Sequence, residues 1–135
     1  MSMGQTFLTV GALAIFGYLA LNVNRMNLDA LVFSIEQQRD LDAIHVGQSL
    51  TDRLYSIPYP LIDLHYAALN DVTSASARMQ HITTIGDTLY TTFQISNTSN
   101  VFNGLSGKVI RIHVFRRIND EFEQRAGFIL TRPQP

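Results

Sequence analysis

Apolar side chains fill the first part of the chain without interruption by charge. Residues 1–24 contain no charged side chain, and the stretch Phe7–Val23 reads FLTVGALAIFGYLALNV. At 1.5 Å of rise per residue this stretch forms a helix of roughly 26 Å, and the uncharged residues 1–5 extend it toward a hydrocarbon core of ~30 Å. The pattern therefore predicts a membrane-spanning helix over residues 1–24.

Two other interpretations of this segment are weaker. A cleaved secretory signal normally begins with Lys or Arg and ends in a small-x-small cleavage site, and neither is present here. A core helix that is apolar on every side needs a larger surrounding domain than this chain supplies. Arg25 is the nearest cation, and by the positive-inside rule it weakly favours a cytoplasmic C-terminal part.

The helical pattern continues over residues 25–57 but becomes amphipathic. Apolar residues recur at helical spacing, first at Leu28, Leu31, Val32 and Ile35 and then at Ala43, Val46, Leu50, Leu54 and Ile57. Gly47 is the weakest point of this helix, since Gly costs about 1 kcal/mol relative to Ala. Pro58 and Pro60 end it, because Pro has no amide proton and disfavours a helical residue before it.

After residue 58 the apolar period changes to two. Residues 61–69 can form two helical turns, and strands are predicted over 79–85, 88–96, 108–117 and 122–131, with a longer loop over 97–107. The predicted fold is α+β, a long N-terminal helix followed by a small four-stranded antiparallel β-meander. Three parts follow: a hydrophobic helix (1–24), its amphipathic continuation (25–57) and a small antiparallel β domain (58–135).

Small residues recur every third position within the hydrophobic helix, at Gly11, Ala14, Gly17 and Ala20. Larger residues accompany them at Val10, Leu13, Phe16 and Leu19. A smooth helix face lets another helix approach closely in lipid, so the stripe favours helix–helix packing. The alternative is that Gly and Ala are simply common in membrane helices.

Composition and motifs indicate no reaction chemistry. Net charge is −1 and Cys is absent, which excludes disulfides, thiolate metal sites and cysteine nucleophiles. The histidines at 45, 65, 81 and 113 show no paired ligand spacing, and Asp63-x-His65 would need a third metal ligand. No nucleophile elbow or phosphate-binding loop is present. We therefore expect no catalytic residues, no metal, no cofactor and no nucleic-acid partner.

One strand carries most of the clustered positive charge, in Lys108, Arg111, His113, Arg116 and Arg117. This cluster could contact an acidic neighbour, such as residues 120–123 of another subunit. It could equally be a solvated strand face with edge charges that discourage sheet pairing.

The chain resembles the type IV pilin and pseudopilin superfamily. Those proteins have a short leader ending in Gly, a hydrophobic assembly helix with an amphipathic continuation, and a small antiparallel sheet. By this resemblance Gly4 ends a leader and Gln5 begins the mature chain. The sequence departs from the pattern where Thr9 stands in place of a Glu that matches a neighbour's N-terminal amine, and where the leader lacks Lys or Arg.

The resemblance implies a non-enzymatic structural subunit that assembles with copies of itself into a filament or pseudopilus, its β domain extracytoplasmic. The residues that would line the assembly and membrane helix are Phe7, Leu8, Thr9, Val10, Gly11, Leu13, Ala14, Phe16, Gly17 and Ala20. The alternative is an uncleaved single-span accessory subunit of a larger membrane complex. A third interpretation, a soluble domain that binds a small ligand, rests only on the loop over 97–107.

Overall fold

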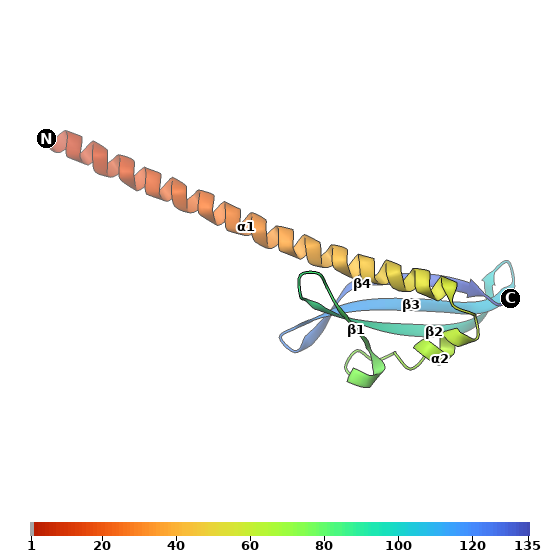
Figure 1. Cartoon of the computed structure of the whole chain (residues 1–135). Helices are drawn as coiled ribbons and strands as arrows, with labels where there is room; N and C mark the ends of the chain where they lie inside the picture. Colours follow the sequence, from red (N-terminus) through yellow and green to blue (C-terminus); the bar gives the residue numbers. More distant parts are fainter. Residues whose placement is uncertain (1) are drawn as a thin grey trace. The chain divides into compact units, whose positions relative to one another are not determined.

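A computed structural model describes residues 2–135. One long helix, α1 (Met3–Ser56), is followed by the short helix α2 (Leu61–Tyr66) and the 3₁₀ turn η1 (Ala75–Ala77) (Figure 1). The strands are β1 (Met79–Ile82), β2 (Thr88–Phe102), β3 (Leu105–Ile118) and β4 (Glu121–Pro133). The predicted α+β fold, a long N-terminal helix and a four-stranded antiparallel meander packed against it, is confirmed.

The chain divides into two compact units, one that ends at Gln38 and one that spans Arg39–Pro135. Helix α1 contributes to both. In the second unit, the C-terminal part of α1 lies along one face of the sheet (Figure 1). We call this face of the sheet the inner face and the opposite one the outer face.

The end of α1 is held by β4. The Arg132 guanidinium donates hydrogen bonds to the carbonyl oxygens of Leu54 and, at 3.1 Å, Ile57. The last carbonyls of a helix have no partner within the helix, and a cation near them also interacts favourably with the helix dipole. This contact and Pro58 together explain why the helix ends at Ser56.

The sheet is a simple meander in the order β1-β2-β3-β4, with every neighbouring pair antiparallel. The segment 97–107, expected as a loop, instead extends β2 and β3 into a longer hairpin around Asn103–Gly104. Both turn residues have positive φ, 50° and 82°, which an Asn-Gly pair adopts readily. The loop on which a ligand-binding interpretation rested is therefore mostly strand.

The core of the second unit lies between the inner face and the helices. Phe93 of β2 is opposite Ile112 of β3, which is opposite Phe128 of β4, and these side chains face α1. Tyr66 of α2 packs on Phe93 with 4.7 Å between ring centroids. The buried apolar residues are Ala43, Leu50, Leu54, Ile62, Tyr66, Leu89, Phe93, Ile110, Ile112, Val114 and Leu130.

Candidate functional site

The most exposed apolar surface of the protein is the first part of α1. Within residues 2–35, every residue except Asn22 is exposed to solvent in the single chain. Phe7 is 73% exposed and Phe16 76%. The residues predicted to form the assembly helix, from Phe7 to Ala20, all belong to this surface. This helix is long and apolar enough to cross a membrane.

The exposed apolar surface is longer than a membrane span requires. From Met3 to Ile35 the helix measures about 50 Å at 1.5 Å per residue, whereas a hydrocarbon core is ~30 Å thick. Beyond Arg25, which ends the uncharged segment, Leu28, Leu31 and Val32 are still 55–60% exposed. Large apolar side chains outside the bilayer normally mark a surface that another protein covers.

The exposed side chains of α1 contain a heptad repeat that was not predicted from the sequence. Positions alternate in steps of three and four through Phe7, Val10, Ala14, Gly17, Leu21, Asn24, Leu28, Leu31, Ile35 and Gln38. We call this set the heptad seam. Repeats of this period are typical of helices that pack along one another, and a single Asn within them fixes register. The signal is present in the sequence, but it crosses the boundary at Arg25 between the charge-free segment and its amphipathic continuation.

The N-terminus of α1 is closed by a reciprocal capping arrangement. The Ser2 hydroxyl accepts a hydrogen bond from the Gln5 amide at 3.2 Å, and the Gln5 side-chain oxygen accepts one from the Ser2 amide at 3.3 Å. This is a capping box, in which each side chain satisfies a backbone donor that the helix leaves unpaired. The bond between Gly4 and Gln5, the candidate leader-cleavage site, therefore lies within the first turn.

Thr9 occupies the position where the pilin resemblance would place Glu. Its hydroxyl donates a hydrogen bond to the Gln5 carbonyl oxygen at 2.8 Å. A hydroxyl bonded to its own helix carries no negative charge, and the first turn of α1 contains no acidic residue. The first acidic residue of α1 is Asp29, so the helix supplies no carboxylate near the position where a pilin-like Glu would neutralise the N-terminal amine of a neighbouring copy.

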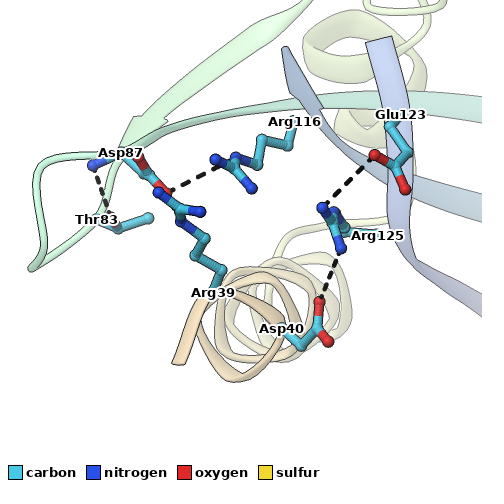
Figure 2. Close-up of polar contacts among 7 residues, drawn as sticks. All are labelled: Arg39, Asp40, Thr83, Asp87, Arg116, Glu123 and Arg125. Atoms are coloured by element: carbon cyan, nitrogen blue, oxygen red, sulfur yellow. Dashed lines mark hydrogen bonds and ion pairs between the residues drawn. The ribbon is translucent and has the colours of Figure 1, made fainter. Parts of the chain in front are cut away.

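Ion pairs fasten α1 to the sheet at the start of the second unit. Figure 2 shows that Arg39 and Asp40, adjacent in α1, are engaged by different parts of the sheet. Arg39 Nε lies 2.7 Å from the carboxylate of Asp87, on the turn between β1 and β2. Asp40 lies 3.5 Å from Arg125 of β4.

Each of these pairs has a further charged neighbour. Arg116 approaches Asp87 at 3.8 Å, and Arg125 lies 3.5 Å from Glu123 (Figure 2). Partly exposed pairs contribute ~1 kcal/mol or less each. They therefore orient the helix on the sheet more than they stabilise the fold.

Lys108 is the most deeply buried cation of the second unit. The residue is 5% exposed, and its ammonium donates to the Asp63 carboxylate and to Asn97 Oδ1, the latter at 3.0 Å. The ring of Tyr59 lies 5.0 Å from the ammonium. A buried charge is tolerated only when it is paired and hydrogen-bonded, so this cluster is the structural anchor of α2 on the sheet.

The four histidines lie on four different elements, α1, α2, β1 and β3. Among residues 2–135, no three side chains of His, Cys, Asp or Glu are grouped as metal ligands would be. Asp63, from the Asp63-x-His65 pair, is engaged by Lys108. Burial lowers the pKa of His81, whose Nε2 is buried without a hydrogen-bond partner. His81 lies on β1 and pairs in register with Leu89.

Comparisons with protein-family models, curated proteins and solved structures found no match to this chain. The architecture is nonetheless pilin-like: a hydrophobic N-terminal helix whose continuation packs on a four-stranded antiparallel sheet.

Proposed function

We propose that this protein is a non-enzymatic structural subunit that assembles with copies of itself through the exposed part of α1. The observation that carries the proposal is the length of the exposed apolar surface, which exceeds a bilayer by more than two helical turns. A simple anchor needs no apolar residues at 28, 31 and 35. A helix that packs along identical helices does.

In this proposal, lipid and neighbouring helices compete for the same surface. In the bilayer the hydrophobic segment is held as a monomer, and in a filament or pseudopilus lateral helix packing replaces the lipid contacts. The β domain would then face outward on the extracytoplasmic side. Small residues at Gly11, Ala14, Gly17 and Ala20 would allow close helix approach within lipid.

The cysteine-free chain allows a direct test by disulfide trapping. Leu31 belongs to the heptad seam, whereas its neighbour Ala30 points about 100° away around the helix. In native membranes treated with a mild oxidant, Leu31→Cys should form covalent dimers of the chain, and Ala30→Cys should form few. Equal trapping at both positions, or none at either, would contradict self-assembly through the seam.

A second function is favoured by the capping box at Ser2 and Gln5. A leader peptidase that cut after Gly4 would remove Ser2 and with it this helix cap. The cap therefore favours an uncleaved chain, as in a single-span accessory subunit of a larger membrane complex. Intact mass and N-terminal sequencing of the native protein distinguish a processed filament subunit from an uncleaved accessory subunit. A chain that begins at Gln5 supports leader processing, and one that retains Ser2 supports the accessory subunit.

A further inference from the structure

The outer face of the sheet carries positive charge and no acidic side chain at any of its strand positions. Residues alternate between faces along each strand, and the registers place a defined set on the side away from α1. On β3 this set is Val109, Arg111, His113, Phe115 and Arg117. On the other strands it consists of Gln80, Ile82, Thr88, Tyr90, Thr92, Gln94, Ser96, Thr98, Phe122, Gln124, Gly127, Ile129, Thr131 and Pro133.

The structure separates the clustered cations of β3 into two groups. Lys108 and Arg116 face inward, where they contact Asp63 and Asp87. Arg111 and Arg117 face outward. Arg111 is exposed and has no ion-pair partner within residues 2–135, and Arg117 pairs with Asp120 at 2.8 Å in the exposed β3–β4 turn. Because β3 lies between β2 and β4, these charges do not protect a sheet edge.

Aromatic rings lie between and beside the outward cations. Phe115 is opposite Tyr90 in the register, and the Tyr90 ring meets Phe122 edge to face at 5.4 Å. The guanidinium of Arg78 lies 4.3 Å from the Tyr90 ring centroid and 5.2 Å from that of Phe122. These rings are half-buried, so part of each remains accessible.

The outward-facing side chains of β3 form a row whose spacing suits an extended polyanion. Arg111, His113, Phe115 and Arg117 occupy every second position of β3, so the row is roughly 20 Å long. Ile129, which is opposite Arg111 in the register and 70% exposed, adds apolar surface to the outer face beside Arg111. Cations that track a backbone, combined with rings on which bases stack, are the two components of single-strand nucleic-acid surfaces.

We propose that the outer face binds single-stranded DNA, with phosphates at Arg111 and Arg117 and bases stacked against Phe115 and Tyr90. The alternation of rings with cations matches the alternation of bases with phosphates along a single strand, and an acidic protein surface is the alternative that the test below separates. The net charge of −1 conceals this surface, because the acidic residues that offset its cations lie on the inner face, the helices and the turns. The proposal goes beyond the assembly role and does not depend on it.

The test is binding of a fluorescently labelled oligothymidine to the full chain in detergent micelles, followed by anisotropy at several salt concentrations. Arg111→Gln should weaken binding and reduce the slope of log K against log salt by about 0.7, the value for one phosphate contact on a single strand. Phe115→Leu keeps an apolar side chain but removes the ring, and should weaken binding about fivefold or more. Arg53→Gln removes an exposed cation from α1 and should change neither quantity.

Three results would overturn the proposal. The first is no binding of the oligothymidine at low salt by the folded wild-type chain. The second is an equal loss of affinity in Arg53→Gln and Arg111→Gln, which would indicate diffuse charge attraction. The third is competition by polyglutamate as effective as competition by unlabelled oligothymidine, which would show that the face binds acidic polymers in general. Circular dichroism of each variant verifies that the fold is retained.

Discussion

The ring of Phe128 on β4 fills the space beside Gly47 where a β-carbon would otherwise lie. Gly47 is buried in the middle of the part of α1 that packs on the sheet, and Phe128 packs against the hydrophobic core. The absence of a side chain at residue 47 thus lets helix and sheet approach closely enough for this contact. Gly47, which the sequence presents as a weak point of the helix, is required by packing, and α1 continues through it.

Gly47→Ala should destabilise the second unit. The added methyl group gains about 1 kcal/mol of helix propensity. It would, however, force the Phe128 ring out of its site, and overpacking of this kind costs typically 1–3 kcal/mol. Denaturant unfolding of the full chain in detergent should show a lower midpoint. Ser49→Ala, an exposed substitution on the same helix, is the control and should not lower it. A midpoint raised in both variants would show that Phe128 moves aside freely.

Gly17→Leu and Gly11→Leu should impair assembly without unfolding the β domain. A β-carbon at either position meets no atom within 4 Å in the single chain, so the substitutions fit an isolated subunit. A Leu there would hold a neighbouring helix away. Chemical crosslinking in native membranes measures assembly, and the denaturant midpoint measures folding. Ala12→Leu, on a different part of the helix circumference, is the control. Wild-type crosslinking in both Gly variants would contradict close packing along the small-residue stripe.

Asp63→Ala should destabilise the fold more than Lys108→Met does. Without Asp63, the Lys108 ammonium stays buried with only Asn97 and the Tyr59 ring near it, at a cost of about 1–3 kcal/mol. The Asp63 side chain is 49% exposed, so solvent limits the loss. Lys108→Met leaves no buried charge, and the half-exposed Asp63 carboxylate that loses its partner can be solvated by water, so this loss should be smaller. Denaturant unfolding of the two single variants and the double variant measures the loss of unfolding free energy in each. A larger loss in Lys108→Met than in Asp63→Ala would contradict this prediction.

The sequence predicted the helix, its end and the four strands because each depends on a local signal. Charge-free length marked the hydrophobic segment, Pro58 and Pro60 marked the helix end, and alternation marked the strands. The hairpin around Asn103–Gly104 carried its own turn signal, but Asn, Ser and Gly nearby suggested a loop. Arg111 and Arg116 are five residues apart on β3, so strand alternation alone places them on opposite faces. Which of the two faces α1 covers is not a local property, so the exposure of the Arg111 face emerged only from the structure.

The stability of the second unit should fall below neutral pH in part because of His81. Burial lowers the pKa of this imidazole below its ordinary value of 6.5, so the folded state holds it neutral. The unfolded chain takes up a proton at pH values near and below 6.5, and the folded chain does so only at lower pH. Proton uptake therefore favours unfolding as the pH falls from 6.5 toward the lowered pKa of the folded state.

His81→Gln removes this titration and should flatten the pH dependence of the unfolding free energy between about pH 7.5 and 5. Gln also keeps a polar atom near the position of the buried Nε2, so the comparison concerns charge more than size. His45→Gln, at an exposed position of α1, serves as the control and should retain the wild-type slope. Equal slopes in the wild type and His81→Gln would show that the buried imidazole accepts its proton in place, with water or a neighbouring group reaching Nε2.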